Sequence, residues 1–174
     1  GSMEKSCYRL FPFGILREPI NSLKRADFIV WTRKKNVDSE NLFCKYKSKI
    51  LPVNEKYWLL NEKNERLNID KVIRVVAVCG IGHPNSFIDT LNSFKVDVVG
   101  KYIVSDHFNY KAKNMGEIYS IAATKNATHI ITTEKDYYKL KPLNKKNTPI
   151  LILEMDLHME DRVILKAIKN LINK

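Results

Sequence analysis

The sequence predicts an α/β protein, a three-layer α/β/α sandwich built on a mainly parallel sheet and preceded by a β-ribbon connector. Over residues 71–174, short apolar runs rich in β-branched residues alternate with segments of helical periodicity. The polar stretch 36–70 carries strand-like runs at Leu42–Leu51 and Lys56–Leu60 around a turn, a pattern typical of an antiparallel ribbon. With 174 residues, the chain is long enough for one core of ordinary size, so we expect one main domain.

The segment 72–87 predicts the opening unit of this domain. Its apolar run, 72–78, is short and β-branched, which is typical of a strand buried on both faces. Gly80-Ile81-Gly82 breaks the run, and Pro84 suits the first turn of a helix, where a missing N–H costs nothing. The helix that follows has an apolar face formed by Phe87, Ile88, Leu91 and Phe94.

The rest of the chain alternates in the same way, which favours parallel strands joined by right-handed crossovers. We expect a lead-in at Leu10–Leu23, strands at Ala26–Arg33, Val96–Val104, His129–Thr133 and Pro149–Leu153, and helices at Ala112–Thr124, Glu134–Leu140 and Glu160–Ile172. The closing helix carries Val163, Ile164, Ala167, Ile168 and Leu171 at core spacing. The expected division is 1–3 as a cloning remnant, 4–35 as lead-in and strand, 36–70 as ribbon, and 71–174 as an α/β lobe.

The formal charge of +11 favours a polyanionic partner: nucleic acid, an anionic membrane surface or a phosphorylated substrate. The alternative is that lysines scattered among asparagine and isoleucine reflect an AT-rich genome. No apolar run is long enough to predict a membrane span, which leaves a peripheral membrane role open. The three cysteines lack metal-ligand spacing, so we expect a reducing compartment.

Polar residues follow three strands of the predicted sheet at the point where each strand ends. Gly80 and Gly82 follow the first, and without the third glycine of a dinucleotide fingerprint they favour a tight turn over ligand contact. Asp106 and His107 follow the second, where a histidine is either a general base or anion ligand or simply a surface residue. Glu134-Lys135-Asp136 follows the third and either caps the next helix or contributes to a site.

Because the carboxyl ends of neighbouring parallel strands meet at one edge of a sheet, we expect these three groups to converge there. The sequence has no G-x-x-x-x-G-K-[ST] loop, so it predicts no P-loop phosphate cradle in this chain. No metal ligands are predicted either.

Four motifs, in this order, resemble the C-terminal half of the tetraacyldisaccharide 4'-kinase (lipid A 4'-kinase) family. They are GILREPINSLKRADFIV at Gly14–Val30, CGIGHPNSFIDTL at Cys79–Leu91, SDHFNY at Ser105–Tyr110 and TTEKDYYKL at Thr132–Leu140. The resemblance implies ATP- and Mg²⁺-dependent transfer of the γ-phosphoryl to the 4'-hydroxyl of the lipid A disaccharide 1-phosphate precursor. It places the enzyme at the cytoplasmic face of a Gram-negative inner membrane, as a peripheral protein on an anionic lipid surface.

In that family a P-loop lobe precedes the region matched here and holds ATP and the metal, so the resemblance implies that this chain alone is inactive. His107 matches the family's histidine that orients or deprotonates the sugar hydroxyl, and Asp106 flanks it. Glu134, Lys135 and Asp136 match a motif of the same cleft, to which we also assign Gly80 and Gly82. The strand at Ala26–Arg33 is then the last strand of the preceding lobe's sheet. His83 departs from the asparagine of many relatives.

Two other classes stay open on the sequence: a basic α/β module that binds nucleic acid, and a non-catalytic interaction domain that has kept the fold. The first would show affinity that falls steeply with salt. The chain carries no recognised nucleic-acid motif, so we do not expect a nucleic-acid partner.

Overall fold

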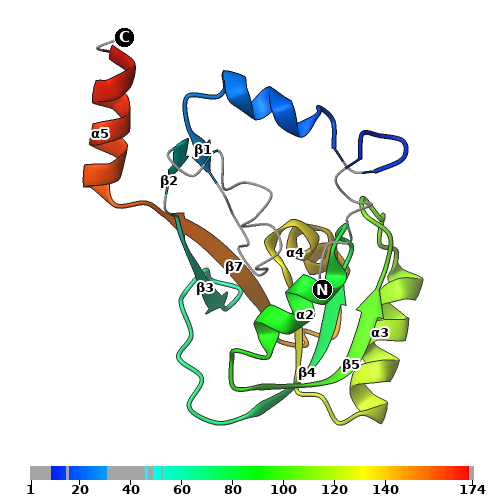
Figure 1. Ribbon diagram of the computed structural model, residues 1–174. Helices are drawn as coiled ribbons and strands as arrows, with labels where there is room; N and C mark the ends of the chain where they lie inside the picture. The colour runs from blue at the N-terminus through cyan, green and yellow to red at the C-terminus, as the bar shows by residue number, and fades with distance from the viewer. Residues whose placement is uncertain (1–8, 15, 31–45, 47–48, 52, 173–174) are drawn as a thin grey trace. The chain divides into compact units, whose positions relative to one another are not determined.

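The computed structural model describes residues 9–14, 16–30, 46, 49–51 and 53–172 (Figure 1). The chain forms two compact units, one of residues 57–156 and one that joins 1–56 to 157–174. The expected lobe began at residue 71 and ran to the end of the chain, so this division differs from it on both sides. The candidate site lies entirely in the unit of residues 57–156.

A five-stranded sheet in the order β3-β7-β6-β4-β5 forms the centre of this unit. The strands are β3 (Asn54–Leu60), β4 (Ile73–Cys79), β5 (Val96–Ile103), β6 (His129–Thr133) and β7 (Ile150–His158). β4 pairs in parallel with both β5 and β6, and β6 pairs in parallel with β7. The chain passes from β4 to the edge strand β5, then returns across β4 to β6, so the connections leave the neighbouring strands β4 and β6 in opposite directions. The prediction of a mainly parallel sheet is confirmed.

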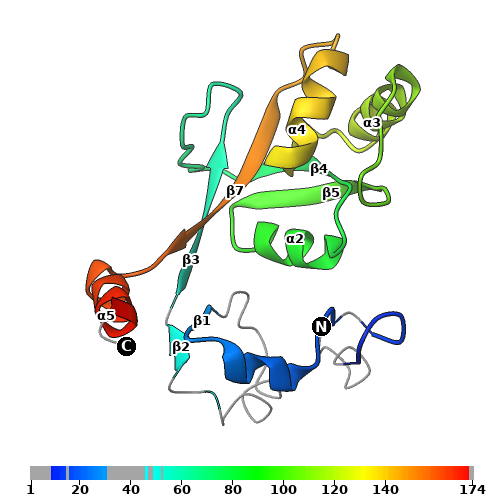
Figure 2. The ribbon, with the colours of Figure 1, turned by 90° about the horizontal axis from the view of Figure 1, so that it is seen from above.

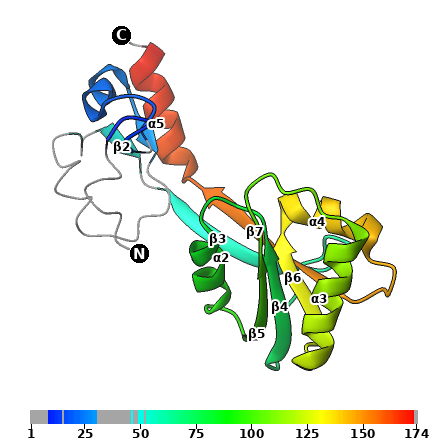
Figure 3. The ribbon, with the colours of Figure 1, turned by 90° about the vertical axis from the view of Figure 1, so that its right-hand side faces the viewer.

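Helices cover both faces of the sheet, α2 (Pro84–Leu91) on one and α3 (Ala112–Thr124) with α4 (Glu134–Leu140) on the other (Figures 2 and 3). Alternate residues of β4 point into the two layers, which is why its residues 75–79 are all apolar and buried. The layer under α2 contains Val75, Ala77, Cys79, Phe87, Leu91, Ile131 and Leu151. The layer under α3 and α4 contains Val76, Val78, Met115, Ile118, Ile130, Tyr137, Leu140, Ile150 and Ile152. The predicted α/β/α sandwich is confirmed.

The local signals explain where these helices begin. Pro84 occupies the first turn of α2, whose N–H groups have no partner within the helix. Thr133 is the N-cap of α4, and its Oγ1 accepts a hydrogen bond from the Asp136 N–H at 3.3 Å. The bounds of α3 and β6 coincide with the prediction.

The structure places β3 differently from the prediction, which put 56–60 in an antiparallel connector. β3 is the edge strand next to β7. It is part of the sandwich, because its consecutive residues Leu59 and Leu60 fill the two opposite core layers. The preceding strand β2 (Ile50–Leu51) pairs in parallel with β1 (Ile29–Val30), which is part of the strand expected at Ala26–Arg33. The rest of the expected ribbon, 36–45, 47, 48 and 52, lies outside the described residues, as do 31–33.

The helix α5 (Asp161–Ile172) belongs to the other unit, whereas the prediction made it the closing helix of the lobe. Only Ala167 is buried, while Ile164, Ile168 and Leu171 are 38–46% exposed. Its periodicity defined an apolar face correctly, but a period does not say what that face packs against. The structure also contains two short 3-10 helices, η2 (Ile20–Arg25) and η4 (Lys141–Leu143). No described helix is both long and apolar enough to cross a bilayer.

Candidate functional site

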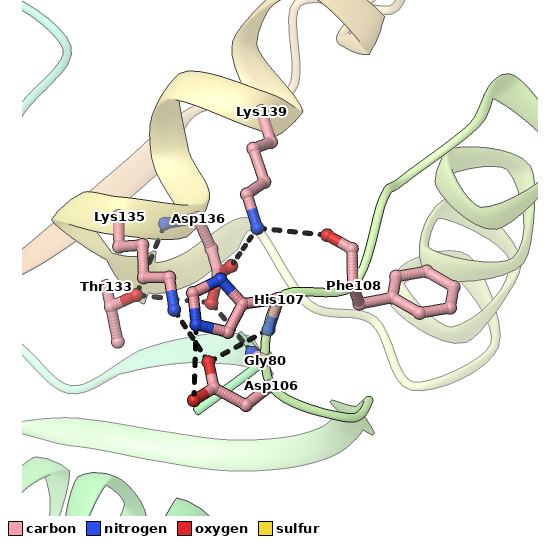
Figure 4. Close-up of polar contacts among 8 residues, drawn as sticks. All are labelled: Gly80, Asp106, His107, Phe108, Thr133, Lys135, Asp136 and Lys139. Atoms are coloured by element: carbon pink, nitrogen blue, oxygen red, sulfur yellow. Dashed lines mark hydrogen bonds and ion pairs between the residues drawn. The ribbon is translucent and has the colours of Figure 1, made fainter. Parts of the chain in front are cut away.

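The three groups predicted to converge do meet at the carboxyl edge of the sheet, where β4, β5 and β6 end (Figure 4). The turn after β4 and the start of α4 are joined directly, since the Gly80 N–H donates a hydrogen bond to Asp136 Oδ2 at 2.7 Å. This is the switch point of the sheet, where chain connections diverge and ligands bind in open α/β folds.

Asp136 is fully buried, with none of its surface exposed. Its Oδ2 also accepts a hydrogen bond from Thr133 Oγ1 at 3.2 Å. Its Oδ1 lies 3.7 Å from the ammonium of Lys139 and accepts no hydrogen bond from a described residue. Asp136 therefore ties the start of α4 to the turn after β4, and its carboxylate does not reach the surface.

Gly80 is a glycine because other backbone approaches it closely. A Cβ at this position would stand 3.0 Å from Ser105 O and 3.0 Å from Val104 Cγ2. A Cβ at Gly82 would meet nothing within 4 Å, and neither glycine has a positive φ. The close approach that the glycine pair predicts is thus needed at Gly80 alone.

The loop after β5 presents His107 to solvent. Its φ of 61° lies in the left-handed region that few residues other than glycine adopt, and its N–H donates to Asp106 Oδ1 at 2.9 Å. The side chain is 84% exposed, and Nε2 lies 3.9 Å from Asp106 Oδ2. The Phe108 N–H closes the turn by donating to Ser105 O at 3.2 Å. The imidazole is therefore exposed to solvent on a loop whose backbone is held by Asp106.

Lys135 links this loop to α4, because its Nζ donates to Asp106 Oδ1 at 2.6 Å. That hydrogen bond, with a smaller contribution from the His107 N–H, holds the pKa of the Asp106 carboxyl below its ordinary value. Asp106 is consequently a carboxylate at neutral pH. Lys135 thus pairs with an aspartate that follows a different strand. Glu134 is exposed in the first turn of α4.

Two buried groups near this edge, Cys79 and Tyr110, are held protonated. Burial raises the pKa of the Cys79 thiol to about 11, with a further contribution from the Asp136 carboxylate. Burial likewise raises the pKa of Tyr110. Neither group supplies a nucleophile near neutral pH, so Cys79 acts as a small buried hydrophobe.

Sequence reasoning missed two residues of this edge. Lys139 donates from Nζ to Phe108 O at 2.9 Å, and its ammonium faces buried Asp136. Thr133 is the N-cap, and the signal for it was present, since a threonine three residues before an acidic residue is typical of a capping pattern. Nothing in the sequence indicated Lys139 beyond its position one turn after Lys135.

The described part of the chain contains no group of three or more His, Cys, Asp or Glu side chains that could hold a metal ion. What this edge offers is an exposed imidazole, an ionised aspartate and two lysines around a buried aspartate. The chain is therefore of the class of parallel α/β proteins whose ligands bind at a switch point of the sheet, and this polar cluster is its candidate ligand site. Comparison with known proteins identifies the family within this class.

Residues 4–173 match the family described as "LpxK: Tetraacyldisaccharide-1-P 4'-kinase". The chain therefore belongs to the tetraacyldisaccharide 4'-kinase family. Among curated relatives, a tetraacyldisaccharide 4'-kinase of Rickettsia canadensis is 33% identical over 87% of this chain and 44% of its own length. One of Pelagibacter ubique is 34% identical over 91% of this chain and 49% of its own length.

The fold is shared with a crystal structure described as the "apo" form of LpxK from Aquifex aeolicus in complex with ATP. That likeness has a TM-score of 0.59 at 23% identity and covers 93% of this chain but 48% of the other. This chain thus spans about half the length of the relatives it matches.

Proposed function

We propose that this chain is the acceptor-side, C-terminal lobe of a tetraacyldisaccharide 4'-kinase. The complete enzyme transfers the γ-phosphoryl of ATP to the 4'-hydroxyl of the tetraacyldisaccharide 1-phosphate precursor of lipid A. Family membership and the coverage of only half of each relative support this assignment. The observation that carries it is the exposed imidazole of His107, fixed beside an ionised aspartate at the sheet's switch point.

Our proposal assigns neither ATP nor Mg²⁺ to this chain. The sequence has no P-loop, and the described residues provide no cluster of metal ligands. Phosphoryl transfer requires a phosphate cradle, a metal site and a positioned nucleophile. Our proposal assigns only the third to this chain and gives ATP and Mg²⁺ to a preceding P-loop lobe, its main partner.

His107 is proposed to accept the proton of the sugar hydroxyl as that oxygen attacks. A general base must have a free ring nitrogen within reach of the hydroxyl, and an 84% exposed imidazole meets that requirement. The Asp106 carboxylate lies beside this ring, with its Oδ2 3.9 Å from Nε2. Lys135 keeps Asp106 ionised and the loop in place. Glu134, Gly80 and Gly82 are proposed to border the same cleft, with Asp136 beneath it.

We further propose that the complete enzyme is a peripheral protein on the cytoplasmic face of the inner membrane. The net charge of +11 supports this, because each lysine near an anionic leaflet contributes on the order of 1 kcal/mol to binding. The phosphorylated glycolipid acceptor would be attracted by the same charge.

The test supplies the P-loop lobe and measures product. This chain alone should transfer no label from γ-³²P-ATP to tetraacyldisaccharide 1-phosphate, and a longer chain in which a P-loop lobe precedes residue 4 should do so. The same longer chain with His107→Ala is the matched control for the lobe's own ATP hydrolysis. Transfer to lipid by the P-loop lobe without this chain, at the rate of the joined protein, would contradict the proposal.

A further inference from the structure

Two lysines one turn apart on α4 reach the loop that carries His107, and they reach it in different ways. Lys135 contacts the side chain of Asp106 where both side chains are more than two-fifths exposed. Lys139 instead donates to the backbone carbonyl of Phe108, the residue after His107, and its own side chain is 32% exposed. Figure 4 shows the two ammonium groups on either side of the histidine.

The Lys139 link is anchored in the interior. Its ammonium lies 3.7 Å from Oδ1 of Asp136, a carboxylate with no exposed surface. The other oxygen of that carboxylate holds the Gly80 N–H. One half-buried ion pair thereby joins the turn after β4, the loop after β5 and the first two turns of α4.

Because water screens the exposed Lys135–Asp106 pair more than the half-buried Lys139–Asp136 pair, the two links differ in strength. Exposed ion pairs contribute little and weaken with salt, whereas a buried charge pair is strongly disrupted when one partner is removed. Lys139 also holds main chain, so it fixes the path of residues 107 and 108 whatever the Asp106 side chain does. The positive φ of His107 needs such support, since the backbone there is not in a favoured region.

From these contacts, and resting on the proposed function of His107, we infer that Lys139 is a positioning residue. Paired with Asp136, it holds the backbone at residues 107–108 and so sets where the imidazole stands. Asp136 is then the internal anchor of this arrangement and makes no contact with substrate.

The first experiment measures the loop directly, in the full chain and without activity. Amide hydrogen exchange in a peptide covering residues 104–110 should accelerate in Lys139→Met by roughly ten- to a hundredfold, the effect expected for losing one hydrogen bond to a charged group. Peptides from α2 should keep their rates. Lys125→Met, at the exposed C-cap of α3, is the matched control and should leave 104–110 unchanged.

Lys139→Met leaves the Asp136 carboxylate buried without its cation, which could unfold the chain. The double variant Asp136→Asn/Lys139→Met removes both charges and keeps a carbonyl oxygen for the Gly80 N–H. It should fold and show the same accelerated exchange at 104–110. Unchanged exchange in a folded variant of either kind overturns the inference.

The second experiment uses the longer chain that includes a P-loop lobe. Lys139→Met should lower kcat for phosphoryl transfer by at least about tenfold, with the KM for the lipid acceptor within twofold, and Lys139→Arg should restore most of kcat by keeping a donor for Phe108 O. If 104–110 loses protection but His107→Ala leaves transfer unchanged, the proposed function fails and the positioning role stands. If His107→Ala slows transfer while Lys139→Met alters neither exchange nor kcat, the positioning role fails and the proposed function stands.

Discussion

Adding one methyl group at Gly80 should destabilise the sheet edge, and adding one at Gly82 should not. In Gly80→Ala the new Cβ would stand 3.0 Å from both Ser105 O and Val104 Cγ2, tighter than ordinary van der Waals contact, so each neighbour must move by a few tenths of an ångström. Overpacking of this kind destabilises the folded state by about 1–3 kcal/mol. Replacing glycine by alanine also reduces the conformational entropy of the unfolded chain, which stabilises the protein by about 0.4–1 kcal/mol. We expect a net loss of about 1–2 kcal/mol in the free energy of unfolding.

The matched control is Gly82→Ala, where the Cβ meets nothing within 4 Å and φ is not positive. It should be neutral or stabilising by up to about 1 kcal/mol, since only the unfolded state changes. Urea unfolding followed by circular dichroism gives both free energies, and the two variants should differ in midpoint while sharing the slope m. Equal midpoints for the two variants would refute the close packing of Gly80 against the loop after β5.

Three further perturbations have definite outcomes. Because the pKa of Asp106 is lowered, its contact with Lys135 should persist through the range in which free aspartates protonate, near pH 4, and be lost only at lower pH. The NMR chemical shift of the His107 amide, which donates to Asp106, should change with the same lowered midpoint. A midpoint at or above about pH 4 would contradict the contact. Because burial raises the pKa of Cys79 to about 11, iodoacetamide at pH 8 should alkylate this thiol at least about a hundredfold more slowly in the folded chain than in urea. Peptide mapping measures both rates. Equal rates would place the thiol at the surface. Leu91→Ala should cost about 2–5 kcal/mol in urea unfolding, because this side chain of α2 is fully buried in the core layer between α2 and the sheet. A loss below about 1 kcal/mol would mean that α2 does not cover the sheet.

The sandwich itself could be predicted because each of its elements carries a strong local signal. The apolar face of α3 and the β-branched run of β6 are unambiguous, and the structure reproduces their bounds. Pro84 marks the start of α2 for the reason predicted. These signals depend on neighbours in sequence, so no knowledge of the tertiary structure was needed.

What could not be predicted depends on contacts between distant segments. β3 was interpreted as part of a connector, because two adjacent leucines after a polar stretch do not reveal that each fills a different core layer. The apolar face of α5 was visible in the sequence, but the assignment of this helix to the other unit was not.

At the candidate site, the convergence of three strand ends followed from topology and was confirmed. Which side chains contact one another at this edge of the sheet could not be predicted. Lys135 selects Asp106 from another strand end, and Asp136 turns inward to Gly80. The sequence placed Asp136 beside exposed Glu134 and Lys135 and gave no sign that it is buried.

The most direct test of the account is the rate of γ-phosphoryl transfer to tetraacyldisaccharide 1-phosphate in the longer chain carrying His107→Ala. A general base contributes about 10²–10⁴-fold, so we expect kcat to fall by that factor, while Lys125→Ala on the same protein keeps the parent rate. Transfer at the parent rate without the imidazole would contradict the assignment of the sheet edge as the acceptor side of the active site.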